Sequence, residues 1–180
     1  MSDEVTIRLA RRGDLPALGR LGATLMRVHH AFDPDRFMAP GDHPEDGYAW
    51  FLGAQLSEPD VVIFVAEQTS QENRPGEPGE LGGPGEVVGY VYAGLEPLSW
   101  KELRVPAGFI HDVVVDPRAR RAGVATRLME RASGWLEGRG APRVMLWTAD
   151  KNTEARQLFE RLGFRSTMVE MTRERRENNS

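Results

Sequence analysis

The chain has 180 residues and no cysteine, with 27 acidic and 23 basic side chains that leave a net charge of −4. That length is enough for one domain with its own core, and the acidic balance gives no electrostatic reason to bind nucleic acid. The lack of cysteine excludes disulfides, thiolate metal sites and a cysteine nucleophile, and together with the acidic start MSDEV and the lack of any 18-residue apolar run it favours a cytoplasmic protein without a membrane span.

The first quarter of the chain is expected to form a strand and two helices. Residues 5–11 alternate and are rich in β-branched side chains, which is typical of a strand. Asp14 is predicted to cap a helix with Pro16 in its first turn and leucines along one face. Residues 29–46 are typical of a loop, and a second helix is expected over about residues 48–56.

Two strong strand patterns follow, at residues 60–67 and 86–96. The segment between them, about residues 68–86, is polar and dense in Gly and Pro. Such a composition has too few apolar groups to offset its ordering entropy, so we expect a flexible hairpin insertion between paired strands. A third strong strand is predicted over residues 108–117, ended by Pro117.

The last third of the chain alternates helix and strand. A helix is expected from Val124 to a close at Gly138 and Gly140, followed by a strand over residues 143–150. A short helix opens at Asn152, and residues 164–172 are predicted as a last strand before a tail that frays from about residue 173. The order of elements predicts a single α/β domain, residues 1–180, with helices on the faces of a mixed sheet.

The stretch RARRAGVATRLME, residues 118–130, places bare backbone and positive charge at the first turn of a helix. Helix N-termini carry unpaired N–H groups and a partial positive charge, which makes them anion sites. Gly123 and Ala125 remove side-chain bulk there, and Thr126 adds a hydroxyl. The stretch therefore predicts a pyrophosphate cradle, with a solvent-exposed turn as the alternative. It is neither a Walker A loop nor a Gly-x-Gly-x-x-Gly motif.

Two blocks at the right separation resemble the GNAT superfamily of N-acetyltransferases. The family's Arg/Gln-x-x-Gly-x-Gly/Ala motif reads here as Arg120, Gly123 and Ala125. Its second mark, an Asn that opens the next helix followed by an aromatic residue and Leu-Gly-Phe, reads as Asn152, Phe159 and residues 162–164. The resemblance covers nearly the whole chain. It implies a mixed, mostly antiparallel sheet of six or seven strands with one splayed parallel pair, flanked by about four helices.

The resemblance also implies acetyl-CoA as cosubstrate and assigns residues to it. The strand segment Val113, Val114 and Val115 is expected to hold the pantetheine arm, with the backbone of Val113 and Val115 as hydrogen-bonding partners. Asn152 is expected to reach the pantetheine, although a plain helix N-cap explains an Asn there as well. The cradle and the last helix complete the expected cofactor set: Arg120, Arg121, Ala122, Gly123, Val124, Ala125, Thr126 and Phe159.

The attacking amine must be neutral, so a base or a proton-relay water helps. The strand before the cradle offers the adjacent residues His111 and Asp112. Strand alternation predicts that their side chains face opposite ways, with His111 on the face of Val113 and Val115. We favour His111 as the base because its ordinary pKa suits proton transfer near neutrality; a structural histidine, with Asp112 or a water relay in its place, is the alternative.

Relatives commonly place a tyrosine in the last helix to protonate the departing thiolate, whereas this chain has Phe159. A thiol with an ordinary pKa of about 8.5 can leave as a thiolate or be protonated by water, so the departure puts the acid in doubt without excluding activity. Tyr48, Tyr90 and Tyr92 are other sources of an acid that the sequence does not place.

The acceptor side is expected to come from the first two helices and their connection, with substrate contacts from His29, His30 and Phe32. Ordinary packing at a helix end is the alternative. A metal site is not predicted, because adjacent histidines diverge on a helix.

The resemblance thus implies an N-acetyltransferase that moves an acetyl group from acetyl-CoA to a primary amine by direct attack in a ternary complex. The acceptor is open between a small molecule, which we favour, and a protein amine. A non-catalytic acyl-CoA-binding or sensor domain of the same fold is the alternative. No nucleic-acid or membrane partner is expected, and because many relatives are dimers a homodimer is one assembly that the resemblance allows.

Overall fold

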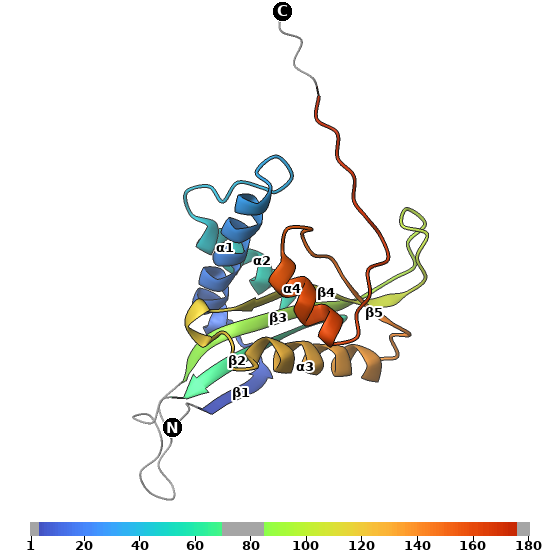
Figure 1. Ribbon diagram of the computed structural model, residues 1–180. Coiled ribbons are helices and arrows are strands. Elements are labelled where there is room, and N and C mark those ends of the chain that lie inside the picture. Colours follow the sequence, from blue (N-terminus) through green and yellow to red (C-terminus); the bar gives the residue numbers. More distant parts are fainter. Residues whose placement is uncertain (1–3, 70–84, 176–180) are drawn as a thin grey trace, which may run out of the picture.

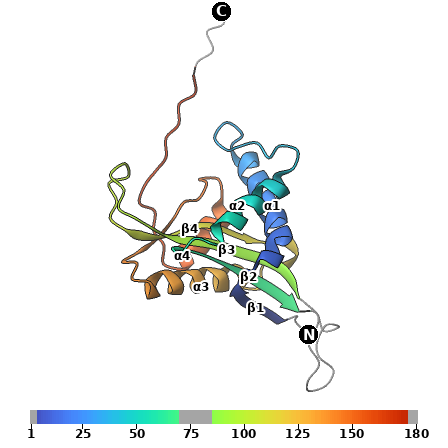
Figure 2. The same ribbon diagram turned by 180° about the vertical axis from the view of Figure 1, so that it is seen from behind.

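The computed structural model describes residues 4–69 and 85–175 and shows one five-stranded sheet with helices on both faces (Figures 1 and 2). The strands stand in chain order, β1-β2-β3-β4-β5; β4 and β5 are parallel and the other neighbours antiparallel. They are β1 (Glu4–Leu9), β2 (Val61–Thr69), β3 (Glu86–Glu96), β4 (Ala107–Val115) and β5 (Val144–Leu146). The helices are α1 (Leu15–Phe32), α2 (Pro44–Gln55), α3 (Val124–Gly138) and α4 (Thr153–Arg161). None of the helices described is long and apolar enough to cross a membrane.

Each face of the sheet buries its own core. Against α3 and α4, the sheet contributes Phe64, Val91, Ile110 and Val115, which pack on Leu128 and other residues of the same cluster. Against α1 and α2, the alternate positions of the same strands contribute a second cluster. The hydrophobic alternation of the strands therefore supplies two separate packed layers, and β4 lies between them.

The α/β class, the splayed parallel pair and the four helices are confirmed, but the expected six or seven strands are not. The described sheet has five strands, and residues 164–172 form an extended segment without a ladder partner. Met168, Val169 and Met171 in this segment are 76–86% exposed. Alternation makes a segment suitable for a strand, but a strand also needs a neighbouring edge; here the β4–β5 ladder ends after three residue pairs. The expected strand over residues 143–150 shrinks to β5 for the same reason.

The first half of the chain differs from expectation at two helix ends. The α1 helix continues through His29 and His30 to Phe32, and α2 begins at Pro44, so the loop between them is shorter than predicted. Asp14 does not cap α1 through its side chain. Its carboxylate instead accepts hydrogen bonds from the Arg8 guanidinium at 2.7 and 2.9 Å and from the Arg11 N–H at 2.7 Å, which ties α1 to β1.

The expected insertion at residues 68–86 lies mostly outside the described residues. The strands on either side of it pair as expected, with Gln68 opposite Glu86. The tail from residue 173 also lies largely outside the described part of the chain.

Candidate active site

The site begins where β4 and β5 separate. The two parallel strands pair only from Gly108 opposite Val144 to Ile110 opposite Leu146. Beyond those pairs β4 continues to Val115 with a free edge on the β5 side. A parallel pair that separates in this way leaves backbone groups available for an added extended ligand.

A bulge in β4 determines which backbone groups reach that free edge. Tyr92 of β3 pairs with Asp112, whereas the next residue, Ala93, pairs with Ile110, so His111 is the extra residue. The Gly108 N–H donates to Arg143 O on the β5 side, and the Asp116 N–H donates to Val88 O on the β3 side.

Alternation from Asp116 backwards directs the backbone of Val115 and Val113 to the open side. The Arg120 side chain supports this direction, because its Nε donates to Val115 O at 3.3 Å. A free backbone edge therefore lies where the pantetheine arm is expected, with backbone polar groups of Val113 and Val115 facing the space between the strands. Val114 lies between them in the chain and packs in the α1–α2 cluster.

The predicted cradle lies at the N-terminus of α3, directly after β4. Gly123 is the N-cap residue and has φ +73°, and a Cβ built on it would meet nothing within 4 Å. Arg121 is also left-handed, with φ +63°. The first α-helical bond into this turn is from the Arg127 N–H to Gly123 O. The amides of residues 121–126 donate to no backbone acceptor among the described residues.

The first turn of α3 has two features that suit the binding of an anion. Its unpaired amides and the helix dipole attract an anion, and Gly123 leaves room for the anion to approach. Not every nearby arginine is available: Arg118 pairs with Asp116 and Glu86, and this pairing lowers the pKa of Asp116. Arg120 and Arg121 are exposed at the cradle, as are Ala122 and Gly123, whereas Val124 is buried in the core and Ala125 and Thr126 are half-buried.

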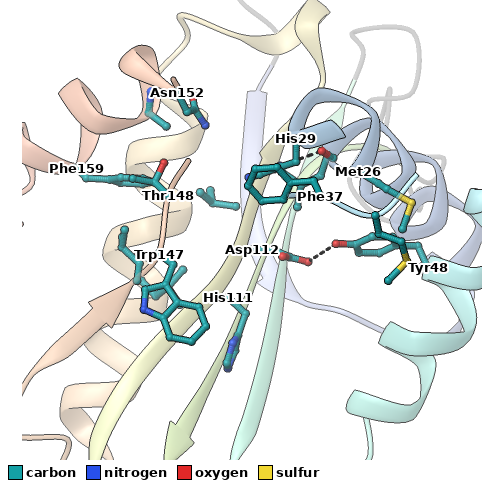
Figure 3. Close-up of a pocket in the computed structure, with 16 residues that line it drawn as sticks. Met26, His29, Phe37, Tyr48, His111, Asp112, Trp147, Thr148, Asn152 and Phe159 are labelled. Carbon is teal, nitrogen blue, oxygen red and sulfur yellow. Dashed lines mark hydrogen bonds between the residues drawn. The ribbon is translucent and has the colours of Figure 1, made fainter. Parts of the chain in front are cut away.

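A cavity of about 260 Å³ opens in the space between β4, β5, α1 and α4 (Figure 3). Its floor is β4 from Ile110 to Val113, and one wall is β5 with its extension to Thr148. The helices complete it, and the remaining lining residues are Leu25, Met26, His29, Phe37, Met38, Tyr48, Asn152, Ala155 and Phe159. The cavity therefore adjoins both the open backbone edge of β4 and the acceptor side expected near α1.

Asp112 is the only carboxylate among the residues that line this cavity. Its Oδ2 accepts hydrogen bonds from Tyr90 Oη at 3.0 Å and Tyr48 Oη at 3.2 Å, and Figure 3 shows the carboxylate and Tyr48 pointing toward one another. Burial raises the pKa of Asp112 above its ordinary value, although the two hydroxyls lower it in part. Burial beside the same carboxylate also raises the pKa of Tyr48 and of Tyr90, so both hydroxyls remain donors.

One oxygen of Asp112 remains available to a ligand. Both tyrosine bonds go to Oδ2. The described residues contain no fully buried side-chain oxygen or nitrogen without a partner, so Oδ1, which accepts neither of these bonds, is accessible to solvent. A desolvated carboxylate held by two hydroxyls, with its second oxygen open to a cavity, suits the binding of an ammonium group and the acceptance of its proton.

His111 is placed differently from the expectation that it shares a face with Val113 and Val115. Because it occupies the bulge, its ring stacks on Tyr92 at 4.7 Å and on Phe109 at 5.1 Å, and its Nε2 lies 3.3 Å from Glu96 Oε1. In Figure 3 the ring is directed away from the Asp112 carboxylate. Burial lowers the pKa of His111, and Glu96 offsets this in part. Alternation failed here because a bulge has no regular period.

Asn152 and Phe159 both line the cavity from α4. The Asn152 Oδ1 accepts a hydrogen bond from the Ala155 N–H at 3.3 Å, so it caps the helix, and its amide nitrogen is left for a second partner. Phe159 is 7% exposed and carries no acid. The cap and the cofactor contact proposed for Asn152 are therefore compatible.

Of the three expected acceptor contacts, the structure brings only His29 to the cavity; His30 and Phe32 do not line it. His29 Nδ1 lies 3.0 Å from Leu25 O, and its ring packs edge-on against Phe37 at 5.0 Å. His30 Nδ1 lies 3.1 Å from Phe37 O. Both histidines thus hold the loop after α1 in place, which the loop-like sequence did not indicate.

The sequence left the tyrosines unplaced, and the structure unites two of them at Asp112. Tyr90 and Tyr92 alternate along β3 on the face that packs against α1 and α2, the same face that Asp112 joins. Their spacing of two residues was a usable signal for a shared face. Tyr48 and Trp147 gave no such signal, because their places depend on how α2 and the end of β5 pack.

Comparisons with known proteins identify the family of the chain. A family model described as the Acetyltransferase (GNAT) family matches residues 25–164. A mycothiol acetyltransferase of Thermobispora bispora is 27% identical over an alignment of 206 positions. The alignment covers 92% of this chain and 64% of that protein. A mycothiol acetyltransferase of Thermomonospora curvata is 30% identical over 136 residues, 72% of this chain and 38% of that protein. The chain thus spans between about a third and two thirds of the length of these curated relatives.

Solved structures share the fold at low sequence identity. A mutant of a Bacillus halodurans protein has a TM-score of 0.73 at 18% identity, with 94% of this chain and 98% of that chain covered. The aminoglycoside N-acetyltransferase AAC(6')-Iy in complex with CoA has a TM-score of 0.67 at 18% identity, with 98% and 97% covered. The family model extends from α1 through the cradle to the end of α4, which is well over half of the sequence. The chain belongs to the GNAT acetyltransferase family.

Proposed function

We propose that this chain is an acetyl-CoA-dependent N-acetyltransferase that acts on a primary amine. The observation that carries the proposal is a continuous arrangement along β4. The cradle at Gly123, the open backbone edge at Val115 and Val113, and the cavity at Asp112 follow one another in that order. A pyrophosphate, an extended pantetheine arm and a reacting thioester occur in the same order in acetyl-CoA.

Each part of the cosubstrate has chain residues that fit it. The amides of residues 121–126 hold the pyrophosphate, and the backbone of Val113 and Val115 receives the pantetheine arm as an added strand would be received. The Asn152 side-chain nitrogen donates to an oxygen of the same arm. When bound, acetyl-CoA supplies an acetyl group activated as a thioester.

We assign the proton-accepting role to Asp112. Its Oδ1 binds the ammonium form of the acceptor and takes one proton, which leaves the amine lone pair free. Tyr48 and Tyr90 hold Oδ2 throughout, so the carboxylate does not rotate. The raised pKa of Asp112 makes it a stronger base than an exposed carboxylate. His111 then supports β4 at the bulge and does not touch the proton.

The departing thiolate needs no acid from α4. The thiol has an ordinary pKa of about 8.5, so its thiolate is a good leaving group near neutral pH. Water that enters the open cavity can protonate the thiolate afterwards. The absence of a hydroxyl at Phe159 therefore does not favour the non-catalytic alternative by itself.

Turnover separates the enzyme from a domain that only binds acyl-CoA. Titration calorimetry with acetyl-CoA tests binding, and release of free thiol with a set of amines, checked by the mass of the acetylated product, tests transfer. Binding together with amine-dependent thiol release is the expected result. Binding without thiol release from any amine would instead identify an acyl-CoA-binding domain.

A further inference from the structure

The acceptor half of the cavity carries few charged side chains. Asp112 is its only carboxylate. Beside the polar side chains of His29, Tyr48 and His111, the acceptor side is lined by the apolar residues Leu25, Met26, Phe37, Met38 and Trp147. Met38 is 75% exposed and Trp147 is 71% exposed, so both leave a large apolar surface in water beside the one ion-binding group. Exposed apolar surface that rims a polar point is typical of a ligand site.

From this lining we infer that the acceptor is a primary amine with a single positive charge on an apolar alkyl or aryl body. The inference rests on the proposed function and gives it a substrate class. The ammonium group lies at Asp112 Oδ1, and the apolar body lies between Phe37 and Met38 on one side and Trp147 on the other. Burial of an apolar body against these side chains removes apolar surface from water and so favours binding.

The charged groups beside the cavity do not line it. Glu96 Oε1 lies 3.3 Å from Nε2 of the lining residue His111 and is engaged with that ring. Lys151 Nζ donates to Phe32 O at 2.6 Å, a link from the start of α4 to the end of α1, and its charge is not neutralised by that carbonyl. Arg36 lies over the Phe37 ring at 5.1 Å. The carboxylate of Glu170 is already paired with Arg36, and that of Asp150 with Arg156.

A polycation would therefore lose more than it gains in this cavity. Its first ammonium group can bind Asp112, but each further ammonium finds no second carboxylate among the lining residues, whose side chains there include Leu25, Met38 and Trp147. A charge that loses water without a partner is costly, and a site rejects such a ligand strongly. The lining thus distinguishes an alkylamine or arylalkylamine from a polyamine or an aminoglycoside.

The test compares four acceptors with the full chain and saturating acetyl-CoA: hexylamine, 2-phenylethylamine, spermidine and neamine. We expect kcat/KM for the two monoamines to exceed that for the two polycations by roughly 10²-fold. A Met38→Glu variant adds a carboxylate at the opening and should raise kcat/KM for spermidine relative to 2-phenylethylamine by about tenfold. Met168→Glu is the matched control, because Met168 is 76% exposed but does not line the cavity.

The outcomes separate this inference from the proposed function beneath it. Spermidine or neamine as the better acceptor of the unaltered protein would overturn the monoamine inference and leave the N-acetyltransferase in place. An unchanged preference in Met38→Glu, or an equal change in Met168→Glu, would also overturn it, because the cavity opening would then not set specificity. Calorimetric binding of acetyl-CoA without thiol release from any of the four amines would overturn the acetyltransferase itself.

Discussion

The two halves of the site, the cradle and the acceptor half at Asp112, use different chemical groups of the chain. The cradle at residues 120–126 uses backbone amides, a glycine with positive φ and a helix dipole. The acceptor half at Asp112 uses side chains from α1, α2, β3 and β4 that meet only in the folded protein. The first half is local in sequence, within seven residues, whereas Tyr48 and Asp112 are 64 positions apart. A binding site made of consecutive residues can be recognised from the sequence. A site whose residues come together only through folding cannot.

The comparison is sharpest at the reacting group, where we expect the largest effect. Asp112→Asn keeps the size of the side chain and removes the proton acceptor, so kcat should fall by roughly 10²- to 10⁴-fold with little change in acetyl-CoA affinity. Because the pKa of Asp112 is raised, the acidic limb of kcat against pH in the unaltered protein should lie above the ordinary carboxyl range.

His111→Ala is the matched variant on the same strand. It removes a ring that stacks on Tyr92 and Phe109, and it should lower kcat by less than about tenfold and preserve the acidic limb. If His111→Ala lowers kcat more than Asp112→Asn does and also removes the acidic limb, His111 and not Asp112 is the proton acceptor.

The cradle should fail in the opposite way, by losing the cosubstrate. A Cβ at Gly123 would have no neighbour within 4 Å, so the indole of Gly123→Trp would occupy the open space that the anion needs. Acetyl-CoA binding, measured by calorimetry, should weaken by at least roughly 10²-fold. The left-handed φ of Gly123 also strains the variant.

Gly140→Trp controls for that strain. Gly140 has φ +88°, an equally open Cβ position and a place at the far end of α3. It should lose similar stability and keep acetyl-CoA affinity within about twofold. Equal affinity losses in the two variants would show that strain, and not the cradle, explains the effect.

The sequence anticipated these two halves unequally for physical reasons. Gly123 and Asn152 could be placed because a helix start has a fixed local geometry, and the open edge of β4 was implied by the family resemblance. The bulge at His111 could not, because it appears only in the register of β4 against β3. The partners of Asp112 depend on the packing of α2, whose start the sequence placed four residues too late. The last expected strand, residues 164–172, had the right alternation and lacked a pairing edge.

Asn152 belongs to both halves of the comparison, since it caps α4 and lines the cavity. Asn152→Ser keeps a capping oxygen and removes the amide donor, so acetyl-CoA binding should weaken by about three- to tenfold with unchanged stability. Asn152→Ala should show the same loss of affinity and also lose about 1 kcal/mol of stability. Full affinity in Asn152→Ser would limit this residue to its capping role. Calorimetry and thermal denaturation give the two measurements.

The smallest expected effect is on stability, and it comes from the group with the largest effect on rate. The folded protein raises the pKa of Asp112, chiefly by burial, so the folded state binds the Asp112 proton more tightly than the unfolded state does. Ionised Asp112 therefore lowers the free energy of unfolding at neutral pH. This cost disappears as pH falls through the raised pKa toward the unfolded value of about 3.9. Asp112→Asn should accordingly raise Tm at pH 7.

For a chain of this size, each 1 kcal/mol gained corresponds to roughly 2 to 4 °C in Tm. The Tm difference between Asp112→Asn and the unaltered protein should shrink as the pH falls from 7 to 4. Paired carboxylates elsewhere, such as Asp14 with its lowered pKa, lose stabilisation in acid equally in both proteins and cancel in the difference. A lower Tm for Asp112→Asn at pH 7 would mean that the hydroxyls of Tyr48 and Tyr90 stabilise the ionised carboxylate by more than burial destabilises it. A higher Tm together with lost turnover would show that the acceptor half sacrifices stability for reactivity, which the backbone-built cradle does not need to do.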